Sequence, residues 1–207
     1  YGKVYAIRVF DLPDPSRQAR GRPINNVLPL NNDEQISTFV VVKSFDEDGH
    51  LFLSTKFGMI NKIPISLFKK IRNTGLKAIL LKPKDELLGA LYTTGKNKIM
   101  LIADNGKAIK FSETDVRVRF RGTLGVRGIN LPKDTKLKSI LKPEGGEIIT
   151  ITENGYGNRV SADSYNTQKR GGMGVIGIKT SKRNGKVVGA VNVNDGDNII
   201  LITNKGK

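Results

Sequence analysis

The sequence predicts an all-β fold, a propeller-like array of four-stranded blades of about 50 residues each. Two observations predict it. A strand–turn–glycine–strand motif recurs along the chain, and a second motif that begins with glycine recurs at the same interval in a different phase. The 207 residues hold about four units in one domain, residues 1–207, and we expect the complete ring to be larger. A four-stranded unit of this size cannot cover both of its faces, so neighbouring blades must pack on one another.

The first motif is an apolar strand, a turn, a glycine and a second strand. Two of its turns end in Asn-Gly, the pair that supplies the positive φ angles of tight hairpins. Each copy therefore predicts a β-hairpin. The motif glycines are Gly2, Gly58, Gly106, Gly155 and Gly206. The approximate repeats are residues 1–50, 51–98, 99–147 and 148–198, with the start of a further copy at 199–207.

The second motif and a third apolar run complete each unit. Copies of the second motif are Gly75–Leu81, Gly125–Leu131 and Gly174–Lys179, with a looser copy at Gly21–Ile24. The third run recurs as Ile36–Val42, Leu87–Thr93, Leu137–Leu141 and Val187–Val193. Their β-branched residues predict strands, about four in each unit. The alternative is a β-sandwich whose strands are evenly spaced by chance, but three markers that keep step over four copies favour the propeller.

The charge of the chain indicates a polyanionic partner. Lys and Arg number 35 against 19 Asp and Glu, which leaves a formal charge of +16. Nucleic acid is the favoured partner, because no apolar run or basic amphipathic stretch indicates a membrane. The absence of cysteine excludes disulfides and fits a cytoplasmic location. The chain opens at Tyr1 with no initiator Met, so we expect it to be a piece of a longer protein.

The basic residues keep the period of the second motif. Equal phase in a repeat array means an equal position on every blade, so they predict one continuous positive stripe along one edge of the array. Such a stripe fits the phosphate backbone of double-stranded DNA. The predicted DNA-binding residues are Arg17, Arg20, Arg22, Lys69, Lys70, Arg72, Lys77, Arg117, Arg119, Arg121, Arg127, Lys169, Arg170 and Lys179.

Glycines lie among these cations. A glycine lets the backbone approach a phosphate closely and present its N–H group, and we assign this role to Gly21, Gly122, Gly171 and Gly172. The alternative is that each glycine only forms a turn. We expect weak sequence preference, because no helix is predicted for the major groove and aromatic residues make up only 6% of the chain, with no Trp.

No pattern predicts a catalytic residue, a metal ligand or a bound cofactor in this chain. The segment Gly172–Gly177 matches the dinucleotide-binding pattern by letters, but it precedes a strand instead of a helix. The single histidine, His50, closes a turn between two strands and is expected to be a solvated turn residue, not a metal ligand. The acidic residues are scattered through turns, unlike the paired carboxylates of glycosidases.

Several segments resemble the C-terminal DNA-wrapping domain of the bacterial DNA gyrase A subunit. The resemblance covers essentially the whole chain and is carried by residues 2–13, 19–30, 125–129, 154–157 and 183–191. It implies a β-pinwheel, a propeller-like ring with strands exchanged between blades, which bends duplex DNA around its basic perimeter. It also implies a bacterial, cytoplasmic A2B2 holoenzyme with the gyrase B subunit, which introduces negative supercoils with ATP and Mg²⁺ bound outside this chain.

The diagnostic box of that family, Gln-(Arg/Lys)-Arg-Gly-Gly-(Arg/Lys)-Gly, would lie upstream of Tyr1 by the repeat phase. The segment Gln168–Gly174 is close to it, with Met173 where a cation is expected. The topoisomerase IV A subunit carries a similar domain with degenerate boxes and is one alternative; a propeller scaffold for RNA or protein is another. Salt-sensitive DNA binding, weakened by Arg119→Ala with Arg121→Ala, and a change in linking number are expected of a wrapping domain.

Overall fold

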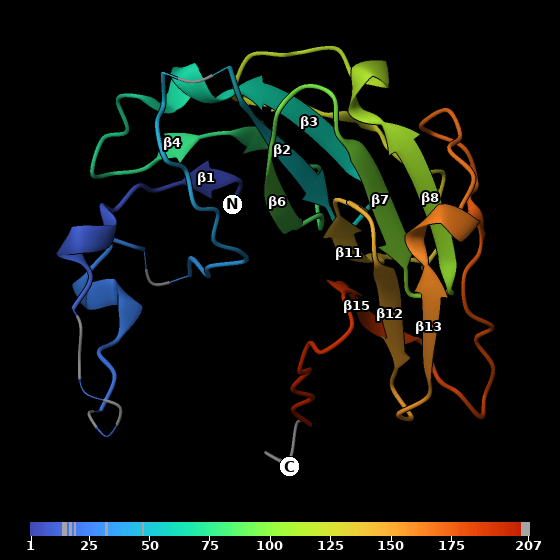
Figure 1. Cartoon of the computed structure of the whole chain (residues 1–207). Coiled ribbons are helices and arrows are strands. Elements are labelled where there is room, and N and C mark those ends of the chain that lie inside the picture. The colour runs from blue at the N-terminus through green and yellow to red at the C-terminus, as the bar shows by residue number, and fades with distance from the viewer. Residues whose placement is uncertain (14–15, 17, 19, 32, 47, 204–207) are drawn as a thin grey trace.

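The structure is a computed structural model that describes residues 1–203 except 14, 15, 17, 19, 32 and 47. In this part of the chain, regular structure consists of short strands and single 3-10 turns, with no α-helix. The sheets stand beside one another along an arc, from β1 (Lys3–Val4) near the N-terminus to β15 (Val187–Val193) near the C-terminus (Figure 1). The predicted all-β class is confirmed.

Two four-stranded antiparallel sheets form the middle of the arc. The first has the order β10 (Val126–Arg127), β3 (Met59–Pro64), β2 (His50–Thr55) and β6 (Leu87–Thr93). The second has the order β11 (Leu137–Leu141), β7 (Lys98–Ala103), β8 (Lys107–Ser112) and β14 (Val175–Ile176). In each sheet the hairpin of the first motif supplies the two central strands, and the third apolar run supplies one edge.

The other edge strand of each sheet comes from the following repeat unit. In β10, Arg127 lies opposite Met59, and in β14, Ile176 lies opposite Lys107. Three other strands of the unit that donates β10, namely β7, β8 and β11, lie in the next sheet along the arc. The first unit follows the same rule, because β1 pairs with β4 (Leu76–Lys77). The structure therefore has the exchanged strands that the resemblance implied.

The outermost units contain fewer strands among the described residues. The fourth unit is a three-stranded sheet of β13 (Gly157–Ser161), β12 (Glu147–Thr152) and β15. In the first unit, the predicted strand Ile36–Val42 is wrong. Its residues alternate between half-buried and exposed, but they join no sheet. The equivalent strands β6 and β11 pair with the strand that precedes a hairpin glycine, and among the described residues no such strand pairs with residues 36–42. The predicted motif glycine Gly206 lies outside the described residues.

Short connecting elements complete the arc. A parallel pair joins β5 (Ile79–Leu80) to β9 (Thr123–Leu124). The 3-10 turns are η1 (Val9–Asp11), η2 (Ile24–Asn26), η3 (Ile65–Phe68), η4 (Glu113–Asp115) and η5 (Ala162–Ser164). Each of η3, η4 and η5 directly follows the second strand of a hairpin and so marks the same point of the repeat.

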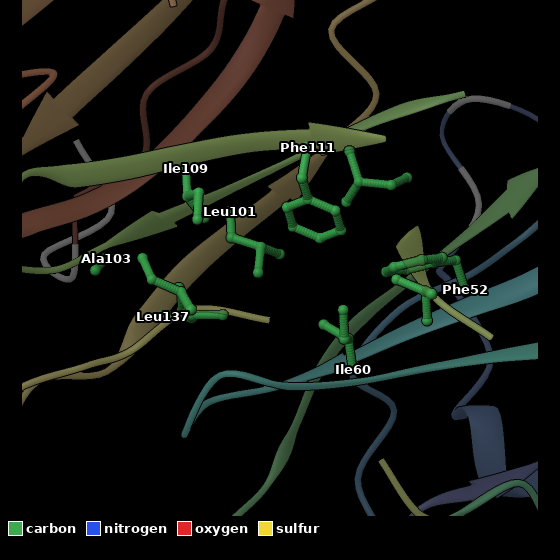
Figure 2. Close-up of a cluster of buried hydrophobic side chains, with 10 residues drawn as sticks. Phe52, Ile60, Leu101, Ala103, Ile109, Phe111 and Leu137 are labelled. Atoms are coloured by element: carbon green, nitrogen blue, oxygen red, sulfur yellow. The ribbon is translucent and has the colours of Figure 1, made fainter. Parts of the chain in front are cut away.

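The core lies between neighbouring sheets. Phe52 and Ile60 project from one central sheet toward Leu101 and Phe111 of the other, and the centroids of the two phenylalanine rings are 6.4 Å apart (Figure 2). Alternate residues of β7 and β8 pack instead against the fourth unit. Strand β7 is buried on both faces, which explains why its sequence, Ile99–Ala103, is apolar without alternation. Each unit therefore depends on its neighbours for a covered core.

Two buried lysines tie neighbouring units together. The ammonium of Lys62 donates to the carbonyl of Glu113 at 2.8 Å, and that of Lys110 donates to the carbonyl of Ala162 at 2.9 Å. Both lysines lie four residues after a hairpin glycine, and both acceptors begin the 3-10 turn of the next unit. Burial lowers the pKa of Lys62, and the charge of Glu113 opposes that shift. Sequence patterning did not separate these two lysines from exposed ones.

Strand exchange explains the glycine of the first motif. Gly106 has a φ of 80°, and a Cβ atom there would lie 2.0 Å from the carbonyl oxygen of Ile178, two residues after the exchanged strand β14. The equivalent Gly155 has a φ of 79°, but nothing lies within 4 Å of its Cβ position. The hairpin turn thus needs glycine for its backbone angle, and the exchanged segment adds a steric requirement where it is present.

Candidate nucleic-acid interface

The two edges of each sheet face opposite sides of the arc. Strand β11 contacts both β6 and β15, so these three edge strands lie together on the concave side (Figure 1). The exchanged strands β10 and β14 lie at the opposite edges of their sheets. The loops that lead from one unit back to its exchanged strand therefore run along the convex perimeter. We call residues 69–75, 116–125 and 165–174 the perimeter loops.

Hydrogen bonds link the perimeter loops in series. The Gly122 N–H donates to the Ala78 carbonyl at 2.7 Å, beside the parallel pair of β5 and β9. In the next step, the Gly171 N–H donates to the Gly128 carbonyl at 2.6 Å. These two bonds connect the second and the third perimeter loop, each to the segment that follows the preceding loop.

Most of the predicted cations lie on this perimeter. Eight of them are in the perimeter loops, and Lys77, Arg127 and Lys179 lie in or just after the second-motif strands. All eleven are exposed except Arg119 and Arg170, which are half-buried. Those in the loops are Lys69, Lys70, Arg72, Arg117, Arg119, Arg121, Lys169 and Arg170.

The predicted cations of the first unit lie outside the perimeter loops. Arg20 and Arg22 are exposed and precede η2 in the N-terminal segment at one end of the arc (Figure 1). Arg17 lies outside the described residues. The predicted stripe therefore rests on the cations around the second, third and fourth copies of the second motif.

Acidic side chains leave the perimeter charge almost uncompensated. Among the described residues, Lys69 forms an ion pair with Asp46, and no other predicted cation lies within 4.0 Å of a carboxylate. Several cations instead bind carbonyl groups: Lys77 donates to Tyr1 at 2.9 Å, and Arg119 donates to Leu124 at 3.2 Å. Carbonyl contacts do not neutralise the charge. The electrostatic field therefore remains strongly positive along the perimeter.

The glycines of the perimeter act mainly through their conformation. Gly122 and Gly171 have φ angles of 70° and 81°, which favour glycine, although a Cβ atom would fit at both positions. Their N–H groups are bonded to carbonyls within the protein, so the expectation that these two N–H groups face a phosphate is wrong. For Gly21 and Gly172 the described contacts include no such bond, and close phosphate approach stays a prediction.

The repeat pattern, the sheet order and the strand exchange all have counterparts among known proteins. Residues 2–43, 49–94, 97–142 and 146–194 match the family described as DNA gyrase C-terminal domain, beta-propeller. The chain belongs to the DNA gyrase C-terminal domain family. The predicted family and the propeller-like fold class are confirmed.

Relatives and solved structures agree with this family. The chain is 44% identical over 206 residues to the DNA gyrase A subunit of Escherichia coli (strain K12), covering 99% of this chain and 24% of that protein. It therefore spans about a quarter of the length of that relative. The C-terminal domain of DNA topoisomerase IV superposes with a TM-score of 0.83 at 26% identity, over 94% of this chain and 61% of that one. A DNA gyrase A C-terminal domain gives 0.81 at 29% identity, over 94% and 63%.

The segment that resembles the gyrase box, Gln168–Gly174, forms a clamp on the perimeter. The Gln168 N–H donates to a carbonyl of β8 at 2.7 Å. The guanidinium of Arg170 donates to the carbonyls of Asp115 and Arg127, both at 3.0 Å. In this member of the gyrase C-terminal family, the Gln-Lys-Arg-Gly-Gly sequence thus fastens the third perimeter loop to the second. The half-buried Arg170 keeps other N–H donors available to a phosphate.

Two residues depart from the sequence interpretation. His50 begins β2 and is half-buried, so the expectation of a solvated turn residue is wrong. Burial is the main cause of its lowered pKa, and the charge of Lys62 adds to it.

Lys107, opposite Ile176 in the exchanged strand, is a cation near the perimeter that the second motif did not mark. Its position directly after a hairpin glycine, like that of Lys3, is the signal that could have found it.

Proposed function

We propose that this chain binds duplex DNA along its perimeter loops and bends it, as the DNA-wrapping domain of a gyrase A subunit. The observation that carries the proposal is the alignment of cations on backbone segments that are hydrogen-bonded in series; among the described residues, only Lys69 of these cations pairs with a carboxylate. Contacts of this kind neutralise phosphates and release counterions, and they carry no base sequence. The described residues include no helix that could read the major groove.

Bending explains why several loops must act together. Curving 20–30 base pairs through 40–90° costs of order 1–6 kcal/mol, more than the few cations of one loop are expected to offset. The three perimeter loops occupy equivalent positions on successive sheets along the arc. A duplex that follows the arc could therefore contact each loop in turn. Family membership supports the same conclusion, because the relatives are subunits of DNA gyrase.

The activity of the whole enzyme is part of the proposal. We infer that the wrap supports ATP-dependent negative supercoiling by an A2B2 holoenzyme with the gyrase B subunit, in the bacterial cytoplasm. ATP and Mg²⁺ would be used in other parts of that enzyme, and we propose no cofactor for this chain. The fold is shared with a topoisomerase IV domain, but the identity of 44% to a gyrase A subunit favours gyrase over topoisomerase IV.

A topology assay tests the proposal. The chain is bound to relaxed, nicked plasmid, the nick is religated, and the topoisomers are separated after the protein is removed. If the protein wraps the DNA, the linking number of the religated plasmid shifts. If the protein binds the DNA without wrapping it, the linking number stays unchanged. The Arg117→Ala, Arg121→Ala variant should reduce the shift, and the Lys98→Ala, Lys138→Ala variant should retain it. An unchanged linking number with the unmodified chain at saturating protein contradicts the proposal.

The choice of variants follows from the contacts. Arg117 and Arg121 have exposed side chains, and within the described part of the chain they make no ion pair or side-chain hydrogen bond, so their removal mainly changes charge. Replacing Arg119 would also remove its hydrogen bond to Leu124 and could shift the loop. Lys98 and Lys138 are exposed on β7 and β11, away from the exchanged edge, and their removal changes the net charge by the same amount.

A further inference from the structure

One perimeter residue breaks the charge pattern. Phe120 lies between Arg119 and Arg121, five residues before the glycine of the second motif, and its side chain is 76% exposed. The equivalent positions, five residues before Gly75 and Gly174, are Lys70 and Lys169. An aromatic ring thus stands in water at a point where the neighbouring units place a cation. Exposure of an apolar ring is unfavourable in the free protein, so a bound partner that covers it would gain free energy.

The backbone that carries Phe120 is fixed on both sides. The N–H of Arg119 donates to a carbonyl of β3 at 2.9 Å, and the N–H of Gly122 donates to Ala78 at 2.7 Å. The hydroxyl of Thr123 donates to the carbonyl of Phe120 itself at 3.0 Å. The ring is therefore carried by a loop whose backbone is held in place by these bonds. A rigid mount limits the conformational entropy lost on binding.

The surroundings of the ring match a duplex better than a protein partner. Arg117 and Arg121 are exposed, and no carboxylate among the described residues pairs with them. Two phosphate-binding cations thus flank one apolar side chain. Minor-groove proteins that bend DNA use this combination, in which basic residues hold the backbone and an apolar wedge enters between two base pairs.

We propose that Phe120 is such a wedge: it inserts at a base step in the minor groove and kinks the duplex where it crosses the second perimeter loop. This inference rests on the proposed DNA-binding function. Partial unstacking of one step localises a bend that would otherwise be spread along the duplex. Pyrimidine–purine steps such as TA unstack most easily, so the wedge gives an otherwise non-specific surface a preference for placing such a step at this loop.

Fluorescence of a base analogue tests the wedge. The complete chain is bound to a duplex of about 30 base pairs that carries 2-aminopurine beside a single central TA step. Unstacking by the unmodified chain should raise the fluorescence, and Phe120→Ala should abolish the rise and weaken binding by about fivefold or more, the lower range for loss of an aromatic contact with a base. Phe120→Lys should also abolish the rise while making the salt dependence steeper by about one contact.

The controls separate the wedge from the proposed function. Phe39 is as exposed as Phe120, at 77%, but lies in the segment 36–42 and not on a perimeter loop, so Phe39→Ala should leave fluorescence and affinity unchanged. Equal melting temperatures of the variants exclude a folding defect. If the unmodified chain binds with normal salt dependence but the fluorescence does not respond, or responds equally in Phe120→Ala, the wedge is wrong and the wrapping function stands. If the unmodified chain does not bind duplex DNA, the proposed function itself is wrong.

Discussion

Removal of Arg117 and Arg121 should change the salt dependence of DNA binding by a calculable amount. Both side chains are exposed and neither is paired with a carboxylate among the described residues. For a wrap with about eight phosphate contacts, a plot of the logarithm of the affinity against the logarithm of the salt concentration should have a slope of about −7. Two contacts fewer should give a slope of about −5.4. Between 50 and 200 mM salt, the loss of affinity should then decrease from roughly 10⁴-fold to roughly 10³-fold.

Fluorescence anisotropy of a labelled duplex, measured across this range of salt, gives both slopes directly. The protein stability should change by no more than about 0.5 kcal/mol, because neither side chain makes a contact that the fold needs. The Lys98→Ala, Lys138→Ala variant loses the same charge elsewhere and should keep most of the original slope. Equal slopes for the two double variants would show that net charge alone drives binding and would refute the perimeter as the contact surface.

Three further predictions concern stability and are checked by chemical denaturation. Gly106→Ala should destabilise the chain by several kcal/mol because the new Cβ atom collides with the exchanged segment, whereas Gly155→Ala should cost only about 1 kcal/mol of backbone strain; equal effects would contradict the steric account. Lys62→Met should lower the free energy of unfolding by about 1–3 kcal/mol because it leaves the buried carbonyl of Glu113 without its donor; an unchanged free energy would show that this hydrogen bond between units does not stabilise the fold. Lys84→Asn should stabilise the fold by up to about 1 kcal/mol, because Lys84 has a φ of 64° that asparagine adopts more readily; no gain would mean that its turn is not strained.

The sequence alone predicted the repeat and the side of the blade that carries the charge. Both follow from phase, because residues at equal intervals in a repeat occupy equal positions. The repeat pattern cannot predict which unit supplies the edge strand of a given sheet, because equivalent strands of different units have the same pattern. The pairing of β10 with β3, and not with the hairpin of its own unit, depends on the tertiary arrangement. Nor can phase say whether a strand finds a partner: residues 36–42 have a strand pattern but join no sheet among the described residues.

The sequence predicted which cations belong to the candidate site, but it did not predict which hydrogen bonds their side chains make. The exposed cations followed from their period, whereas the structural bonds of Arg119 and Arg170 go to backbone carbonyls, which every residue possesses and no sequence pattern marks. For the same reason the buried Lys62 and Lys110 were indistinguishable from surface lysines. Their positions in the middle of apolar strands are the only local indication that they are covered.

In each central sheet, the donation of one edge strand by a later unit sets the order in which the chain can complete its sheets during synthesis. Arg127 lies opposite Met59, and the 68 positions that separate them (127 minus 59) must be translated before that edge can close. At 5–20 residues per second, the ribosome takes roughly 3 to 14 s to supply them. During that interval the edge of β3 is without its partner strand, and an unpaired edge is a site at which other chains can add a strand.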